Sequence, residues 1–497
     1  MKKLILYTGS IVLLLLMACS KAEDELPNLE YTAEFAIPVI KDGAISFTEL
    51  WQNRDPNQSL LIQPDGRLVF RYESEQIAVT TLDILGELEF PIIAGLPDTV
   101  SVLPFELPAN ITIQEALISG GILLFQFQAI KDGSSEVTFE LPQITLNDEP
   151  LIIRTGTFSG STIPVNLAGY TFRPQNNNEL IIRYTAMDQE GNRIILENAG
   201  IIARPVLTFV KGSWGREEFQ LNPTTIAIDL YDDRFLNGNV RFTEPTITAY
   251  LESSFGVPIR SRIDILNAHT KRGFPLPIDA SAIDGIDINY PLLEERGQSK
   301  KTVLQLDYTN SNIVEVFDAQ VDQLEYGLTA IANPDDNPIL TSFVEDTSTF
   351  KAQVVVEVPV VGRTSNFITN ETFEAPFEKI SEIAEGEFKL ITENELPVAA
   401  ELQLYFADDQ GVILDSLFAA TAQIVAAAPV DKEGDVTGSK ETITFISVSA
   451  EKMDRLIKAH QIRVRAAFQT SNKGSQNVII RADQFVHFRM GLKFKTK

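Results

Sequence analysis

Reactive side chains are few in this chain of 497 residues, which has three histidines and one cysteine beside 68 acids. His269, His460 and His487 lie far apart, and none stands four residues from another, the spacing that places two zinc ligands on one helix face. Acidic loops occur, but none matches the D-x-D-x-D-G calcium pattern, so exposed turns explain "NPDDNP", "DGID" and "ADDQG". The sequence therefore predicts neither a metal site nor a cofactor.

Patterns for covalent or phosphoryl chemistry are missing as well. The segments "GTFSGS" (156–161) and "GSWG" (212–215) lack the spacing of a G-x-S-x-G nucleophile elbow. No glycine-rich phosphate loop follows an apolar strand. A carboxylate pair for glycoside hydrolysis is recognised by its separation in space, which a sequence does not give. We therefore expect a protein that is not an enzyme. An enzyme of the glycosidase class ranks third, after the two non-catalytic functions described at the end of this section.

The single cysteine, Cys19, lies between an apolar run and a group of acids. A short basic segment begins the chain, and the mostly apolar run of residues 4–17 is shorter than the roughly 20 residues that span a bilayer. The segment "LMAC" (16–19) resembles the bacterial lipobox, in which the cysteine is acylated and the chain is cleaved before it. The resemblance implies a signal peptide of residues 1–18, cleavage between Ala18 and Cys19, and lipid attachment, palmitate for example, at Cys19. The alternative is an ordinary secretory signal with an incidental cysteine.

The residues after Cys19 bear on where the protein is held. Acyl chains bury methylenes at about 0.8 kcal/mol each, which anchors a protein to a membrane without a spanning helix. The acids of "EDE" (23–25), in an expected tether of residues 19–27, are similar to the export signal of surface lipoproteins in Bacteroidota; a solvated linker is the alternative. Ser20 stands where an aspartate signals inner-membrane retention in some bacteria. The expected address is the outer membrane, on its periplasmic or cell-surface face.

Composition limits the class of partner. The formal net charge is −27, with 41 basic against 68 acidic residues, and such a field disfavours nucleic acid and anionic lipid surfaces. Hydrophobic residues make up 44% of the chain, which is typical of a globular protein. The length suits about three domains.

Alternating or short apolar runs predict strands along most of the chain. The clearest are "ELIIRYTAMD" (179–188), "TITAYLESSF" (246–255), "AQVVVEVPVV" (352–361), "ELQLYFADD" (401–409) and "QIRVRAAFQT" (461–470). One helix is predicted at residues 449–460, with Ser449 as N-cap and Met453, Leu456 and Ile457 as its apolar stripe. The expected fold class is all-β, with tandem β-sandwich modules and one short helix near the C-terminus.

Two polar segments predict the domain boundaries. "KGSWGREE" and "NPDDNP" interrupt the strand rhythm near residues 211 and 340. The chain beyond the tether divides there into a first β region (28–211), a second β-sandwich (212–340) and a third β-sandwich with the helix (341–497). Limited proteolysis is expected to cut first at these loops and in the tether.

Three stretches, 120–141, 244–266 and 385–406, share one plan of strand, polar break and strand, with Pro258 and Pro397 in the last two breaks. Two of these units look like late-embryogenesis-abundant-type sandwiches, and convergent hairpins are the alternative. The segments "EFAIPVIKDGAISFTEL", "VVEVPVVGRTSNFITNETFE" and "ADQFVHFRMGLKFKTK" together resemble a group of large all-β lipoproteins of Bacteroidota without assigned chemistry. The resemblance implies a fold and a location.

Glycan contacts are the next class of site. Sugars stack on exposed Trp or Tyr, and the two tryptophans, Trp51 and Trp214, are the stacking candidates, with structural anchoring as the alternative. The segments "DTV" (98–100) and "DSL" (415–417) match a short O-glycosylation pattern of such envelopes, which marks Thr99 and Ser416.

These patterns together predict a non-catalytic envelope lipoprotein, held to the membrane by its lipid, that presents β modules to a protein partner, for example an outer-membrane complex. Unpaired edge strands could receive a strand of that partner. The alternative is a glycan-binding accessory lipoprotein.

Overall fold

The structure, a computed structural model, describes part of the chain. The described residues are 34–52, 59–85, 94–96, 98–105, 107, 111–126, 136–155, 162–175, 178–188, 190–196, 199–230, 235–270, 273–374, 383–456 and 458–496. Cys19, the expected signal peptide and the tether lie outside them. Within them, no helix has the length and hydropathy needed to cross a membrane.

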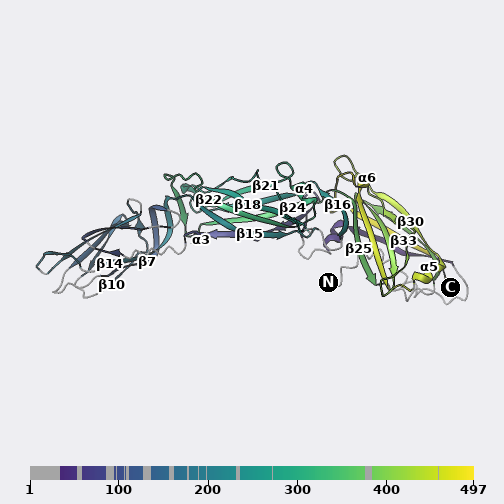
Figure 1. The fold of residues 1–497 in the computed structure, drawn as a ribbon, viewed down its shortest axis with the longest axis horizontal. Coiled ribbons are helices and arrows are strands. Elements are labelled where there is room, and N and C mark those ends of the chain that lie inside the picture. Colours follow the sequence, from purple (N-terminus) through teal and green to yellow (C-terminus); the bar gives the residue numbers. More distant parts are fainter. Residues whose placement is uncertain are drawn as a thin grey trace.

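The described part of the chain is all-β, with 62% of its residues in strands and 6% in helices. Each of the five clearest predicted strands is present, as β12, β17, β24, β27 and β31. Burial follows the expected period of two: in β12 (Glu179–Met187), Leu180, Ile182 and Tyr184 are buried and the residues between them are more exposed. The all-β prediction is confirmed, and the antiparallel sheets form three modules in a row (Figure 1).

The module at the left of Figure 1 is one eleven-stranded sheet. Its path runs β13-β12-β8-β11-β7-β14-β23, and its core contains Phe125 stacked on Phe139 at 4.3 Å between ring centroids. The strands besides β12 are β5 (Ala94–Gly95), β6 (Val100–Pro104), β7 (Thr112–Gln126), β8 (Val137–Leu146), β9 (Glu149–Thr155), β10 (Thr162–Asn166), β11 (Thr171–Phe172), β13 (Arg193–Ile194), β14 (Gly200–Ser213) and β23 (Ser342–Glu345).

The central module, called the middle sandwich below, packs two sheets face to face. A five-stranded sheet contains β15 (Glu217–Ala227), β22 (Val321–Ala332), β18 (Ile259–Thr270), β19 (Leu276–Pro277) and β20 (Asp287–Ile288). A six-stranded sheet contains β2 (Leu60–Ile62), β3 (Leu68–Glu73), β4 (Ile77–Thr80), β24 (Thr349–Pro359), β17 (Thr246–Ser253) and β21 (Lys300–Leu306). Strand β15 ends one sheet, and β2 with β4 ends the other.

The module at the right of Figure 1 contains the first and the last described strands of the chain. Its four-stranded sheet has the order β1 (Glu34–Ser46), β33 (Phe485–Thr496), β26 (Ile383–Asn394) and β30 (Lys440–Val448). Its seven-stranded sheet contains β16 (Phe235–Phe242), β25 (Val361–Glu374), β31 (Gln461–Thr470), β27 (Val398–Ala407), β28 (Ile413–Ser416), β29 (Ala422–Val425) and β32 (Val478–Ile479).

The predicted C-terminal helix is present as α5 (Ala450–Leu456). Ser449 caps it, because its hydroxyl accepts a hydrogen bond from the Lys452 N–H at 3.3 Å, and Met453 and Leu456 are buried. The sequence did not predict the other short helices, whose few residues give too little periodicity. These are α2 (Phe47–Gln52), α3 (Thr81–Leu85), α4 (Ile313–Phe317), α6 (Ser471–Gly474) and the 3-10 helix η2 (Leu293–Glu295).

The two predicted boundary segments meet in space. The Asn333 side chain donates to the Trp214 carbonyl at 2.7 Å, and the Arg216 guanidinium donates to the Pro334 carbonyl at 2.9 Å. Here β14 leads from the eleven-stranded sheet into β15 of the middle sandwich, while β22 leads back toward β23. The boundaries near 211 and 340 stay predictions, and the sheets draw on segments from both sides of them.

Candidate functional site

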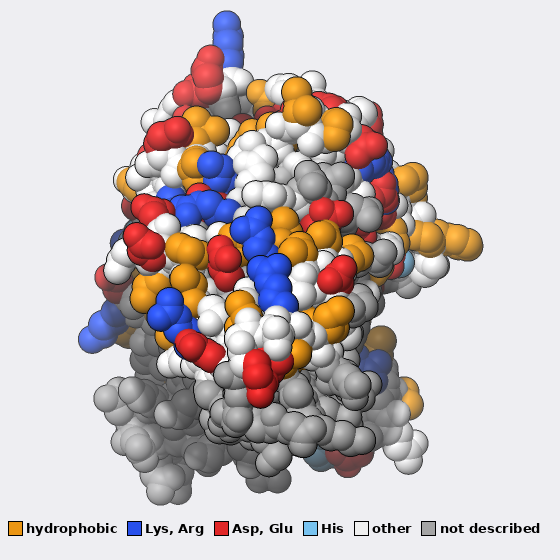
Figure 2. All heavy atoms as spheres, turned by 90° about the vertical axis from the view of Figure 1, so that its left-hand side faces the viewer, with side chains coloured by type: hydrophobic (Ala, Val, Ile, Leu, Met, Phe, Trp, Pro, Cys, Tyr) orange, Lys and Arg blue, Asp and Glu red, His pale blue; other side chains and the backbone are white. Residues whose placement is uncertain are grey.

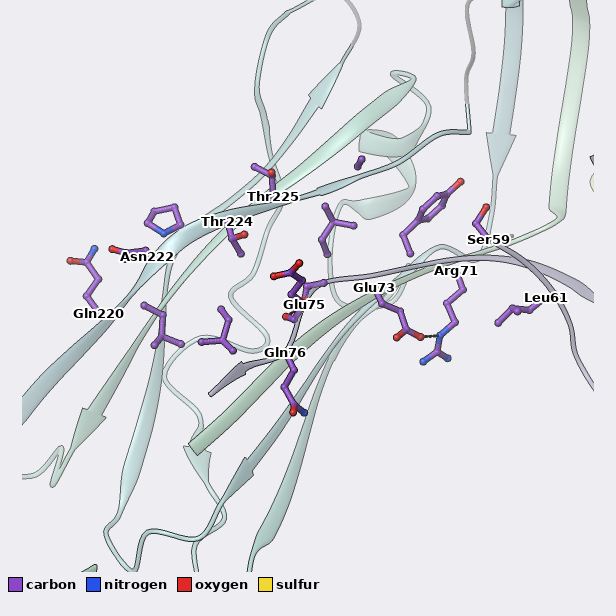
Figure 3. Close-up of a pocket in the computed structure, with 17 residues that line it drawn as sticks. Ser59, Leu61, Arg71, Glu73, Glu75, Gln76, Gln220, Asn222, Thr224 and Thr225 are labelled. Carbon is purple, nitrogen blue, oxygen red and sulfur yellow. Dashed lines mark hydrogen bonds and ion pairs between the residues drawn. The ribbon is translucent and has the colours of Figure 1, made fainter. Parts of the chain in front are cut away.

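The described part of the middle sandwich has a groove of about 1020 Å³ on its side. One wall is the edge strand β15, from Gln220 to Ala227, and the other is the segment 71–77 that joins β3 to β4, with Ser59 and Leu61 beside it (Figure 3). In Figure 3, Glu75 and Gln76 lie between the β15 residues and the pair Arg71–Glu73. The groove therefore runs between the open edges of the two sheets.

Irregular pairing on both walls opens this groove. In β15, the register with β22 shifts between Leu221 and Thr224, so Asn222 and Pro223 form a bulge. Across the groove, three residues, 74–76, oppose two residues of β24, because Glu73 pairs with Val355 and Ile77 with Ala352. Bulges bend a strand and aim its side chains away from the regular pleat, and they are frequent beside functional sites.

The rim of the groove is polar and has an excess of acid. Arg71 donates to Glu73 and, through Nη1, to Glu357 at 2.9 Å. Burial alone would lower the pKa of Arg71, but its hydrogen bonds and charge interactions with Glu73 and Glu357 outweigh burial and raise it. Glu75 is exposed. The lining therefore has two carboxylates, Glu73 and Glu75, and one cation, Arg71, whose charge is already shared between Glu73 and Glu357. The groove favours a ligand that brings positive charge.

Beneath the rim, the space between the sheets is apolar and incompletely filled. Cavities of about 50 Å³ and 30 Å³ lie there, and Leu221 lines the groove and both cavities. Ile77 and Asn222 also line both the groove and the larger cavity. Protein interiors have few voids larger than a water molecule, and water gains no hydrogen bonds between aliphatic side chains. The mouth at Leu221 thus leads from a polar rim to apolar space.

A glycine in the wall of the larger cavity gives a first prediction. A Cβ atom on Gly327 would lie 3.5 Å from Pro223 Cγ and 3.6 Å from Ile265 Cβ, which is ordinary van der Waals contact. Gly327→Ala should therefore raise the free energy of unfolding by about 0.5–1 kcal/mol, because alanine loses less backbone entropy and fills part of the cavity. Calorimetry measures the change; a lower melting temperature would show that the wall has no spare room.

The two tryptophans differ in what the structure describes. Trp214 is buried, with 3% of its surface exposed, and it lines the smaller cavity, so no ring face is open to a sugar in this conformation. Its indole N–H has no hydrogen-bond partner among the described residues. Trp51 belongs to α2, and its side chain lies outside the described part.

The two predicted glycosylation sites lie on different modules. Thr99 is half-buried just before β6, and its N–H donates to Asp98 Oδ1 at 2.7 Å. Ser416 ends β28, and its hydroxyl donates to the Phe418 carbonyl at 3.0 Å. The Ser416 N–H likewise donates to Asp415 Oδ1 at 2.7 Å. In both motifs, therefore, the aspartate accepts a hydrogen bond from the backbone of the next residue. Modification of either hydroxyl stays a prediction.

Asp415 gives a prediction about pH. Burial alone would raise its pKa, but the bond from Arg455 Nε at 2.7 Å, the Ser416 N–H and the charges of Lys452 and Arg455 lower it. A carboxyl with a lowered folded pKa stabilises the protein above its unfolded pKa, near 3.9, and this stability is lost as the pH falls through the folded pKa. Asp415→Asn should melt below the wild type at pH 7, and the difference should shrink as the pH falls below about 3.9 toward the lowered folded pKa.

The control for this prediction is Asp483→Asn, at an exposed position. Thermal unfolding of both variants between pH 3 and pH 8 makes the comparison. A melting difference for Asp415→Asn that stays constant across this range would show that the Asp415 charge is not what stabilises the fold.

The histidines hold no metal arrangement in the described part of the chain. His269 Nε2 lies 2.9 Å from Glu325 Oε2, and His460 Nδ1 lies 3.4 Å from Asp409. No group of three or more His, Cys, Asp or Glu side chains there could hold an ion.

A second open strand edge lies in the C-terminal module. Strand β30 ends the four-stranded sheet, and Ile443 and Phe445 on it are 47% and 59% exposed. Lys389 Nζ lies 5.8 Å from the centre of the Phe445 ring. On the end of the molecule that Figure 2 shows, formed by the eleven-stranded sheet, the described apolar, basic and acidic side chains are interspersed. Exposed apolar edges of this kind are places where another strand can pair.

Sequence reasoning did not identify the groove. Its residues belong to two segments about 150 positions apart, and nothing in either segment alone carries a reactive pattern. One signal was present: Pro223 interrupts an otherwise strand-like run, which marks an edge strand or a bulge.

Comparison with known proteins adds little to this geometry. No family model and no curated protein matches the chain. Among solved structures, it is similar to a "putative secreted protein" from Parabacteroides distasonis ATCC 8503, with 11% identity, a TM-score of 0.28, and coverage of 57% of this chain and 88% of that one. It is also similar to the VP2 subviral particle of infectious bursal disease virus, with 7% identity, a TM-score of 0.15, and coverage of 89% and 83%. Likenesses at these TM-scores carry no argument about function.

Proposed function

We propose that this chain is a non-catalytic lipoprotein of the cell envelope, held at the outer membrane by acyl chains on Cys19, that presents its β modules to a protein partner. The observation that carries the proposal is the pair of open strand edges with apolar side chains or apolar space beside them. These are β15 at the groove and β30 with Ile443 and Phe445. Edge strands are the usual acceptors when one protein binds an extended segment of another.

The location in the proposal comes from the sequence. The lipobox-like segment around Cys19, the acids that follow it and the likeness to lipoproteins of Bacteroidota all support an anchor at the outer membrane. The net charge of −27 suits a partner with basic surfaces and disfavours nucleic acid.

The rival proposal is a glycan-binding accessory lipoprotein. A sugar site usually offers an exposed aromatic face, whereas Trp214 and the one aromatic residue in the groove lining, Tyr72, are both buried. Retention on polysaccharide columns, lost in Trp51→Ala, would favour this rival.

Affinity purification from crosslinked, mildly solubilised membranes tests the proposal. A tagged chain should recover one envelope protein in near-stoichiometric amount, identified by mass spectrometry, in several detergents. Recovery of the chain alone under all of these conditions would contradict the proposal.

A further inference from the structure

We propose that the groove of the middle sandwich receives an extended strand of the partner protein, and that this strand carries apolar residues at alternate positions and at least one Lys or Arg. The inference rests on the proposed function and names its site. The strand pairs with the open edge of β15 and places an apolar side chain over Leu221.

The backbone of β15 is available for such pairing. Its residues bond to β22 on one side, and among the described residues no backbone hydrogen bond joins β15 to β3 or β4 on the other. The eight residues from Gln220 to Ala227 line the groove, which corresponds to roughly 26 Å of strand at 3.3 Å per residue. A guest segment of about eight residues therefore matches its length.

The apolar space under the rim explains why a strand fits better than other ligands. Successive side chains of a strand point to opposite faces, so every second one faces the interior. Leu221, Ile77 and Asn222 form the mouth of the larger cavity, whose other walls are mostly aliphatic. Space of about 50 Å³ holds a small apolar side chain but not a long acyl chain.

Charge selects the guest further. Glu73 and Glu75 line the rim, and Arg71 is already bonded to two carboxylates, so a basic residue of the guest gains more than an acidic one. Because this chain is itself strongly acidic, a second copy of it is a poorer occupant.

The bulge of β15 makes the edge selective. Pro223 supplies no N–H, and the register shift around it interrupts a regular ladder. Natural proteins use such features to prevent indiscriminate pairing of edge strands. A partner strand has to match this irregular edge, which favours one specific protein over random association.

The test is site-specific photo-crosslinking in the full-length protein in its own membranes. Benzoylphenylalanine replaces exposed Asn222 in the groove, and in a control it replaces Tyr250, which is 42% exposed on the outer face of the six-stranded sheet. We expect a protein adduct at position 222 at least ten times stronger than at 250. Mass spectrometry should map it to a strand-like segment of another protein with alternating apolar residues and a Lys or Arg.

Two pairs of variants show whether the adduct needs the groove. Leu221→Trp fills the mouth, and its control, Val303→Trp, places the same bulk at an exposed site on β21; the first should lower the adduct at least tenfold and the second should leave it unchanged. Glu75→Lys reverses a rim charge, and Glu294→Lys reverses an exposed charge outside the lining. Circular dichroism shows whether Leu221→Trp folds. If it does not, the adduct of Glu75→Lys, a substitution at an exposed position, is compared with that of Glu294→Lys to decide whether the adduct needs the groove.

The outcomes separate this inference from the proposed function. An adduct at 222 that is equal to the one at 250, indifferent to both groove variants, or formed with a lipid, a glycan or a second copy of this chain overturns the groove as a strand site. If affinity purification still recovers the envelope partner in that case, the proposed function stands without the groove. If no partner protein is recovered and no adduct forms, both are overturned.

Discussion

Cys19→Ala should remove this protein from the membrane fraction or leave it as an uncleaved precursor. The thiol of Cys19 is the only sulfhydryl that could accept an acyl chain, since the sequence has one cysteine. Each buried methylene of an acyl chain contributes about 0.8 kcal/mol to membrane binding, so loss of two or three chains removes the anchor. The measurement is fractionation of cells together with labelling by a palmitate analogue.

Ser20→Ala, at the next residue, is the control and should be labelled and retained like the wild type. The size of the chain is a second readout, because a lipobox is cleaved before its cysteine, which is Cys19 in this sequence. Normal lipid labelling of Cys19→Ala would contradict the lipobox interpretation.

Asn333→Leu should destabilise the junction between the eleven-stranded sheet and the middle sandwich by about 3–5 kcal/mol. Asn333 is 2% exposed, and its side chain donates to the carbonyls of Trp214 and Asn337 and accepts from the Asn337 N–H. Leucine leaves these buried groups unpaired. The backbone also has a φ of 42°, which suits asparagine better than leucine. A loss of this size should lower the midpoint of thermal unfolding by roughly 10 °C.

A control variant separates the contribution of the hydrogen bonds to stability from that of the backbone conformation. Asn366 has a φ of 57° but is exposed, so Asn366→Leu should cost only about 1 kcal/mol, the conformational part. Calorimetry of both variants gives the comparison. Equal losses would mean that the contact between Asn333 and Trp214 adds nothing to the junction.

Local patterns predicted the elements of this fold well. Period-two alternation located strands such as β12 and β31, because an antiparallel strand with one buried face must alternate. The cap at Ser449 and the stripe at Met453 and Leu456 located α5 in the same way. These signals are contained within a few residues, so one sequence is enough to reveal them.

Long-range pairing was beyond the sequence. Strand β1 pairs with β33, more than 400 residues later. Strand β3 pairs with β24, which follows all the strands of the eleven-stranded sheet in the sequence. No local pattern specifies such partners, because many apolar strands could pair equally well. The two boundary segments were visible as loops, but their contact through Asn333 and Trp214 was not.

The groove was hidden for a related reason. Leu221 and Ile77 look like ordinary core residues in the sequence, and only the opposed bulges at Pro223 and at residues 74–76 leave the space beside them unfilled. Pro223 predicts an irregular edge strand by itself. Which second edge faces it depends on how the two sheets stack.

The most direct measurement is the amount of partner protein recovered with the tagged chain from crosslinked, solubilised membranes, quantified by mass spectrometry for the wild type, Leu221→Trp and Val303→Trp. We predict one envelope protein in near-stoichiometric amount with the wild type and Val303→Trp, and at least a tenfold loss with Leu221→Trp. Recovery of the tagged chain alone in every sample would contradict the claim that it presents its β modules to a protein.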